Sequence, residues 1–123
     1  MWLDGKKKNP TFHYGVLGEG KLSDTVRYVE DGEVGAIEGI DTQHGRRFTW
    51  RGLGLLVLFA SEWEVAAMDP AGEWAVISFS KTLATPEGVD VIVRTKGPVP
   101  QAARDAIAEC PALFEKAKGL TDL

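Results

Sequence analysis

A chain of 123 residues, 44% hydrophobic and 26% charged, has room for one globular domain and can bury enough surface to fold without disulfides. Cys110 is the single cysteine, so an internal disulfide is excluded. The formal net charge of −4 argues against a nucleic-acid partner, and the longest apolar run, Leu55–Ala60, is far too short to span a bilayer.

Short apolar or alternating runs, separated by turn residues, follow one another over most of the chain. The predicted strands are 11–16, 24–30, 33–42, 47–51, 55–60, 63–68, 73–81 and 89–95. Asp31-Gly32 is a strong hairpin signal, because both residues tolerate the positive φ of a two-residue turn. This spacing is typical of an all-β protein and predicts an eight-stranded antiparallel up-and-down β-barrel, in which closure removes the exposed sheet edges.

The pattern changes from strand to helix near the C-terminus. Residues 101–109 are rich in alanine and follow a proline, and Pro111 interrupts them before a second apolar stripe. The apolar positions at helical spacing are Ala103, Ala106, Ile107 and Cys110, then Leu113, Phe114 and Ala117. We expect a single domain, with the barrel over about 9–96 and a short helical segment over about 100–118 packed on its outside.

Several short motifs occur in an order seen in one family of barrels. They are Trp50–Leu55, Trp63-Glu64-Val65 before an acidic turn, Glu73–Val76, a strand ending in Arg94, and Phe114–Leu120. The chain thereby resembles the lipocalins of the calycin superfamily, in particular small intracellular lipocalin-like proteins of bacteria and fungi. The resemblance implies a barrel that binds a small hydrophobic molecule in its interior without a cofactor. It also implies a structural contact between Trp2 and Arg94, a cation–π pair of about 0.5–2 kcal/mol.

No catalytic motif and no metal-spaced set of histidines and cysteines stands in the sequence. Aromatic residues are instead numerous for so small a barrel, and each buries a large area. They either fill the interior or line a cavity for an apolar ligand. The predicted ligand-binding residues are Tyr14, Trp50, Trp63, Trp74 and Phe79.

Three polar strand residues are candidates for acid–base or anchoring roles. Glu38 lies in an otherwise apolar row, so an inward Glu38 would lose its hydration and could act as a general base or hold a polar ligand group. An outward Glu38 would be solvated or salt-bridged. The same two interpretations stay open for His13, and Arg27 could meet either an inward carboxylate or solvent.

Three functions therefore remain open for this sequence. The first is the binding of a small hydrophobic molecule by a cytoplasmic protein, since Met1–Lys8 lacks the apolar core of a signal peptide. The second is a small cyclase or isomerase that shapes a hydrophobic substrate, with Glu38 or His13 as acid–base. The third is self-association as a homodimer, through an outward patch of Trp50 and Phe59.

Overall fold

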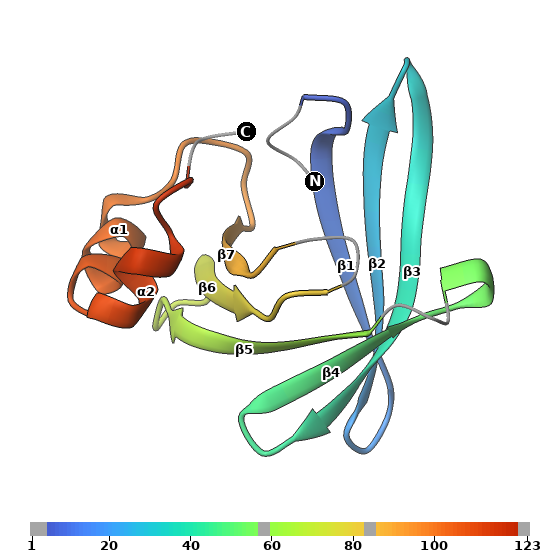
Figure 1. Cartoon of the computed structure of the whole chain (residues 1–123), viewed down its shortest axis with the longest axis horizontal. Helices are drawn as coiled ribbons and strands as arrows, with labels where there is room; N and C mark the ends of the chain where they lie inside the picture. The colour runs from blue at the N-terminus through green and yellow to red at the C-terminus, as the bar shows by residue number, and fades with distance from the viewer. Residues whose placement is uncertain (1–4, 57–59, 83–85, 121–123) are drawn as a thin grey trace.

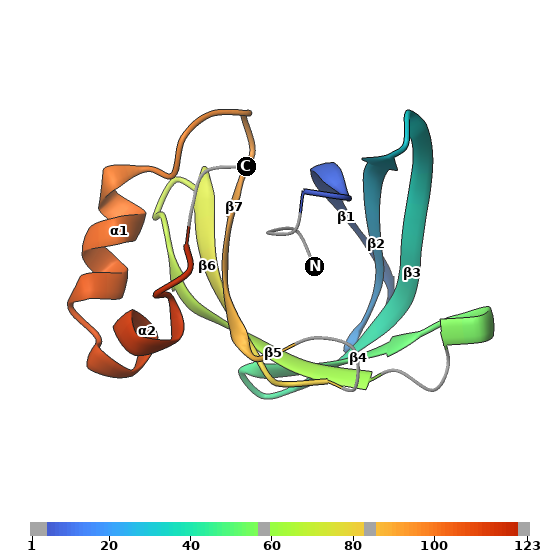
Figure 2. The same ribbon diagram turned by 45° about the horizontal axis from the view of Figure 1, so that its top comes forward.

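Seven antiparallel strands form one continuous sheet in the computed structural model, which describes residues 5–56, 60–82 and 86–120. Each strand pairs with the next along the chain, and the sheet curls into a half-barrel whose edge strands are β1 and β7 (Figure 1, Figure 2). The strands are β1 (Lys8–Gly18), β2 (Lys21–Glu30), β3 (Glu33–His44), β4 (Arg47–Gly52), β5 (Ala60–Met68), β6 (Trp74–Phe79) and β7 (Gly88–Val93). The antiparallel up-and-down order is confirmed, whereas the described residues show neither an eighth strand nor closure of the barrel.

The predicted strand over residues 55–60 is wrong for its first part. Gly54–Leu56 form a single 3₁₀ turn, residues 57–59 lie outside the described part of the chain, and Ala60 already belongs to β5. The partner of β4 is the segment Ala60–Glu64, so β5 begins at the last residue of the predicted strand. A short apolar run carries no periodicity that separates a buried strand from a buried turn.

The hairpin predicted at Asp31-Gly32 is confirmed. Glu30 pairs directly with Glu33, which leaves a two-residue turn between β2 and β3. Asp31 and Gly32 adopt φ values of 52° and 79°, the left-handed conformations that such a turn requires.

Two helices cover the convex side of the sheet. α1 (Gln101–Ala108) and α2 (Pro111–Lys116) lie outside the curl, beside β5, β6 and β7 (Figure 2). The buried core between them and the sheet consists of Val76, Val89, Ala103 and Ile107. The helical segment on the outside of the sheet is therefore confirmed, although Phe114 of the predicted second stripe is 55% exposed. Of the described helices, none is long and apolar enough to cross a membrane.

The core also identifies the two faces of the sheet. Val76 and Val89 point to the helices, so their strand neighbours Ile77 and Asp90, which oppose each other, belong to the concave face. A bulge between Val65 and Ala67 moves Ala67 to the convex face, where it packs against the core. Following the register across the sheet, the concave face carries Phe12 and Tyr14, Asp24 and Val26, Ile37, Gly39 and Asp41, Phe48 and Trp50, Trp63, Ile77 and Phe79, and Asp90.

Candidate ligand-binding site

A groove of about 1040 Å³ runs along the open edge of the half-barrel, with β1 on one side and β7 on the other. Its volume is at the upper end of what small-molecule sites usually offer, about 300–1,000 Å³. The concave part of its wall is largely apolar but includes Asp90, and other charged side chains lie elsewhere along the groove. The apolar residues are Phe12, Val26, Ile37, Phe79 and Ile92, and the charged ones include Glu73, Glu87, Arg94 and Lys96.

Two buried carboxyl groups lie on the concave face of β2 and β3. Asp24 is opposite Gly39, and Asp41 is two residues further along β3 on the same face, so the two side chains are diagonal neighbours. Asp41 is completely buried and Asp24 is 7% exposed. One oxygen of Asp41, Oδ1, accepts a hydrogen bond of 2.9 Å from Trp63 Nε1. The buried Oδ2 receives no N–H donor, and the carboxyl of Asp24 hydrogen-bonds to Asp41 when it is protonated.

The carboxyl groups of the Asp pair, Asp24 and Asp41, influence each other's protonation. Burial, followed by the hydrogen bond to Asp41 and its charge, raises the pKa of Asp24 from 3.8 to about 8. Burial also raises the pKa of Asp41, although its hydrogen bonds with Asp24 and Trp63 oppose that change. Two buried carboxyls this close do not both ionise easily, so we expect one protonated and one ionised group.

Tyr14 connects the Asp pair to the groove. It is 41% exposed, it lines the groove, and it pairs across the strands with Asp24. Burial, and then the charges of Asp24, Asp41 and Asp90, raise the pKa of the Tyr14 hydroxyl. The hydroxyl of Tyr14 therefore stays protonated at neutral pH.

Asp90 adds a third carboxyl from the opposite edge of the sheet. It lies on β7 across from Ile77 and lines the groove directly. Burial raises the pKa of Asp90 to about 6, so this carboxyl is mostly ionised at pH 7. Asp90 thus places one carboxylate in the wall of the groove. The Asp pair, whose Asp24 lies opposite Tyr14, adds a second negative charge on the same face.

The predicted ligand-binding aromatics do not form one group. Tyr14 and Phe79 line the groove from the concave face, and Trp63 lies behind Tyr14 with ring centroids 6.1 Å apart. Trp63 also stacks on Phe48 at 4.2 Å, which holds its indole in place for the bond to Asp41. Trp50 is on the same face, and its ring covers Gly39. Trp74 instead belongs to the opposite face, where it packs against the core beneath the helices, although it also borders the groove.

The three candidate acid–base residues lie together on the convex face. His13 pairs with Thr25, which pairs with Glu38, and Arg27 is two residues further along β2. All three side chains are exposed, and His13 Nε2 lies 3.2 Å from Thr11 Oγ1. The inward placement considered for Glu38 and His13 is therefore not found, because strand alternation points both of them away from the groove.

Of the predicted contact between Trp2 and Arg94, the structure describes only Arg94. Trp2 lies outside the described residues, as does Phe59 of the predicted dimer patch. Arg94 Nε donates a hydrogen bond of 2.6 Å to the carbonyl oxygen of Gly72, so this side chain holds the turn between β5 and β6.

Sequence reasoning missed the Asp pair and Asp90. The available signal is alternation: Asp24 shares a face with Val26, and Asp41 shares one with Ile37. An acidic residue that alternates with apolar ones is desolvated if that face is inward. Because helices cover the other side, apolar residues occur on both faces, and the sequence pattern does not say which of them is concave.

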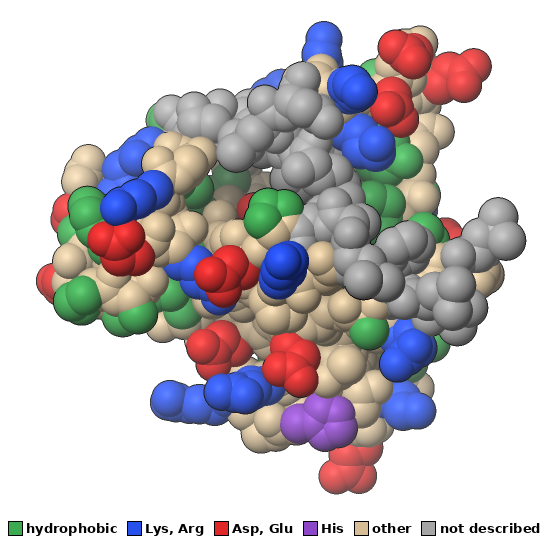
Figure 3. All heavy atoms as spheres, viewed as in Figure 1, with side chains coloured by type: hydrophobic (Ala, Val, Ile, Leu, Met, Phe, Trp, Pro, Cys, Tyr) green, Lys and Arg blue, Asp and Glu red, His purple; other side chains and the backbone are tan. Residues whose placement is uncertain are grey.

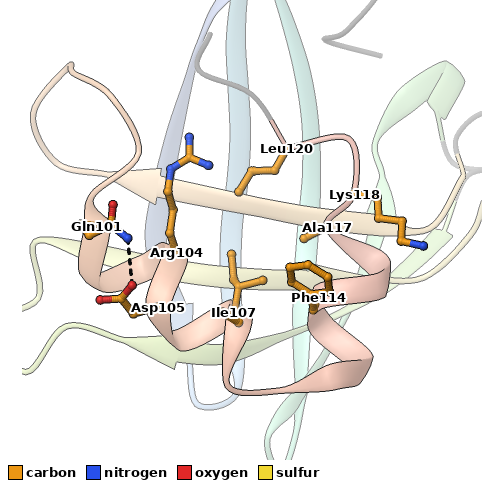
Figure 4. Close-up of a pocket in the computed structure, with 9 residues that line it drawn as sticks. Gln101, Arg104, Asp105, Ile107, Phe114, Ala117, Lys118 and Leu120 are labelled. Atoms are coloured by element: carbon orange, nitrogen blue, oxygen red, sulfur yellow. Dashed lines mark hydrogen bonds between the residues drawn. The ribbon is translucent and has the colours of Figure 1, made fainter.

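A second, smaller hollow of about 480 Å³ lies between the two helices. Figure 4 shows Ile107, Phe114 and Leu120 directed toward this space, with Gln101 and Asp105 hydrogen-bonded to each other at its side. It contains no buried charge pair comparable to that of the sheet. Within the described part of the chain, no cluster of three or more histidine, cysteine, aspartate or glutamate side chains is placed to hold a metal ion.

Comparison with known proteins found no matching family model, no matching curated protein and no matching solved structure. The resemblance to lipocalins therefore stays a prediction from the sequence.

Proposed function

We propose that the protein binds a small, largely apolar molecule in the groove along the concave face. The observation that carries this proposal is the groove itself, about 1040 Å³ in volume with an apolar concave wall. The resemblance of the sequence motifs to lipocalins, itself a prediction, would imply the same function.

The apolar residues of this wall are available to a ligand. Phe12, Val26, Ile37 and Phe79 are each only partly buried, although they occupy the inner face of a curled sheet. A ligand that covered them would remove apolar surface from water, at roughly 25 cal/mol per Å² of favourable free energy. The burial of these side chains by an apolar ligand would therefore favour the bound state of the protein.

The geometry favours binding over the cyclase or isomerase alternative. That alternative relied on Glu38 or His13 as the acid–base group, and both are exposed on the convex face. General acid–base catalysis needs the group within hydrogen-bond reach of the reacting atoms. Neither residue lines the groove.

Replacing Ile37 by tryptophan tests the binding site. Ile37 lines the groove, so the larger side chain should fill part of it and weaken the binding of a fluorescent apolar probe by about tenfold or more, equivalent to about 1.4 kcal/mol. Ala36→Trp is the matched control, because Ala36 is adjacent in β3 but exposed and on the convex face. Titration of the probe with each folded variant gives the affinities. Equal affinities for Ile37→Trp, Ala36→Trp and the unmodified protein, or no saturable binding at all, would contradict the proposal.

A further inference from the structure

We propose that the groove binds a short extended peptide, which pairs as an added strand between the edge strands β1 and β7. This inference rests on the proposed function, because it names the class of molecule that occupies the same groove. The peptide runs antiparallel to both edges. Its main chain bonds to them, and its inward side chains lie on the apolar wall.

The number of strands leaves the sheet open between β1 and β7. Seven strands, each antiparallel to the next, place these two edges in the same direction. The edges therefore cannot pair with each other as antiparallel strands. One further strand that runs opposite to both can pair with each of them and keep the whole sheet antiparallel.

Alternate residues of β1 direct their main-chain groups away from the sheet. A two-residue turn joins Glu30 to Glu33, so this pair and every second pair of the β2–β3 ladder exchange both hydrogen bonds. The even-numbered residues of β2 thus bond to β3, which leaves the odd-numbered ones to bond to the odd-numbered residues of β1. The residues of β1 with outward N–H and C=O groups are Phe12, Tyr14 and Val16.

The same alternation identifies the outward groups of β7. The N–H of Arg94 donates to the carbonyl oxygen of Glu73 at 3.0 Å, and this pair continues the β6–β7 ladder. The even-numbered residues of β7 therefore bond to β6. The residues with outward N–H and C=O groups are Val89, Val91 and Val93. Within the described part of the chain, no other element bonds to the outward groups of either edge.

The outward residues of the two edges suit one and the same strand. Those of β1 direct their side chains to the concave face, whereas those of β7 direct theirs to the convex face. Along any strand, consecutive residues alternate both the face of the side chain and the direction of the main-chain groups. A single added strand can thus bond to β1 through its concave residues and to β7 through its convex residues. A polypeptide main chain has this alternation of donors and acceptors.

The size of the groove suits a short strand. Strands lie about 4.8 Å apart, rise about 3.4 Å per residue and form layers about 10 Å thick, which gives about 160 Å³ per residue. The groove volume of about 1040 Å³ therefore corresponds to roughly six residues. β7, Gly88–Val93, has the same length of 6 residues.

The edge of β1 carries little of the protection that exposed strands usually have. Charged side chains and prolines commonly block the addition of a strand. Between the two irregular positions of β1, the stretch Thr11–Val16 contains no proline, lysine, arginine, aspartate or glutamate. Val16 is 82% exposed. A second copy of the chain could also pair with this edge, but pairing of β1 with β1 would leave β7 open, whereas a strand in the groove uses both edges.

Charge does not select the occupant of the groove. Acidic and basic side chains are intermingled over the face shown in Figure 3. The charged residues that line the groove also have both signs: Glu73, Glu87, Asp90, Arg94, Lys96 and Lys116. A peptide held by its main chain and by apolar side chains matches such a site better than a strongly charged ligand does.

A labelled peptide and its N-methylated form test the proposal. The probe is the heptapeptide Lys-Val-Thr-Val-Thr-Val-Lys with fluorescein at its N-terminus, and its affinity is measured by fluorescence anisotropy. Methylation of the three valine nitrogens removes the N–H donors that face one edge and leaves the side chains unchanged. We expect saturable binding of the probe, and binding about tenfold or more weaker after methylation, because three hydrogen bonds are lost.

Two proline variants locate the added strand on the protein. Val16→Pro removes an outward N–H of β1, and Val93→Pro removes one of β7, without loss of a donor to the existing ladders. Each should weaken peptide binding by about fivefold or more. Val16→Thr and Val93→Thr are the matched controls, because threonine keeps the N–H and the branched shape, and they should bind the peptide within about twofold of the unmodified protein. Circular dichroism and thermal unfolding establish that each variant is folded.

The outcomes separate this proposal from the proposed function. If the neutral apolar probe binds and the peptide does not, groove binding stands and the added strand is overturned. If neither binds, the proposed function itself is wrong. Equal affinities of the plain and N-methylated peptides, or of the proline and threonine variants, would also overturn the added strand.

Two further results would assign the place of the strand to another occupant and overturn the proposal. The first is a dimer in light scattering that Val16→Pro dissociates, which would place a second copy on β1. The second is peptide binding only by a variant that lacks residues 1–4, which would place the chain's own N-terminal segment there.

Discussion

At the scale of single residues, the burial of the Asp pair on the concave face costs folding free energy. Two carboxyls are removed from water, and the fixed donor they receive is the indole N–H of Trp63. Burial of an ionised carboxylate is strongly unfavourable, so a shared proton is the arrangement that lets both groups stay inside. The stability of the fold should therefore depend on the protonation of this pair.

Replacing Asp24 by asparagine should remove much of this pH dependence. Unfolded Asp24 releases its proton near pH 3.8, whereas the folded group holds it up to about pH 8. The folded state thus binds more protons between these values, and its contribution to stability is complete below about pH 4 and lost as the pH rises through 8. Asparagine keeps an N–H donor for Asp41 and does not ionise. We expect it to be more stable than the unmodified protein by about 1–3 kcal/mol at pH 8.5, and the advantage to shrink toward pH 5.

Urea unfolding at pH 5.0, 7.0 and 8.5 measures this dependence. Glu38→Gln is a suitable control, since its exposed side chain should leave the pH profile unchanged. A parallel offset of Asp24→Asn at every pH would mean that Asp24 does not titrate in this range.

At the scale of the strands, the inner face is built from aromatic rings that lie over glycines of a neighbouring strand. Tyr28 covers Gly35, Trp50 covers Gly39, and Phe79 covers Gly88. A Cβ atom at any of these glycines would collide with the ring. The missing side chains leave room for the rings to approach the backbone of the neighbouring strand closely.

Gly39→Ala tests this packing directly. The added methyl group would meet the Trp50 indole and the backbone of Arg51, so we expect the free energy of unfolding to fall by about 1–3 kcal/mol. Gly18→Ala is the control, because nothing lies within 4 Å of a Cβ atom at that position. Urea unfolding compares the two. Equal stability of both variants would show that the Trp50 ring moves aside without cost.

The elements also show what a single sequence can and cannot predict. Local chemistry was sufficient at Asp31-Gly32, where the turn requires two positive φ values, and at Pro111, which begins α2. It failed at residues 55 and 56, which were predicted as strand and form part of a 3₁₀ turn, because a short apolar run has no period. The residues of the candidate site were harder to predict from the sequence than the turns and helices. Alternation groups Glu38 with Ala36 correctly, but only the position of the helices decides that this group is outside and Asp41 inside.

At the scale of the whole molecule, the two faces of the sheet have different roles. The helices cover the convex side of β5, β6 and β7, and the core of Val76, Val89, Ala103 and Ile107 lies there. The concave side keeps partly exposed apolar residues and opens at the edge between β1 and β7. The hydrophobic cluster beneath the helices thus lies on one face, and the other face presents partly exposed apolar residues to a ligand.

Ile107→Ala tests this division of roles. Ile107 is 4% exposed and packs with Val76 and Val89 beneath α1, so truncation should lower the free energy of unfolding by about 2–4 kcal/mol through lost burial and a cavity. Phe114→Ala removes a larger side chain that is 55% exposed, and we expect a loss of about 1 kcal/mol or less. Below the unfolding transition, both variants should bind the apolar probe with unchanged affinity, because Ile107 does not line the groove. Weaker probe binding by folded Ile107→Ala would show instead that the helices support the shape of the groove through the sheet.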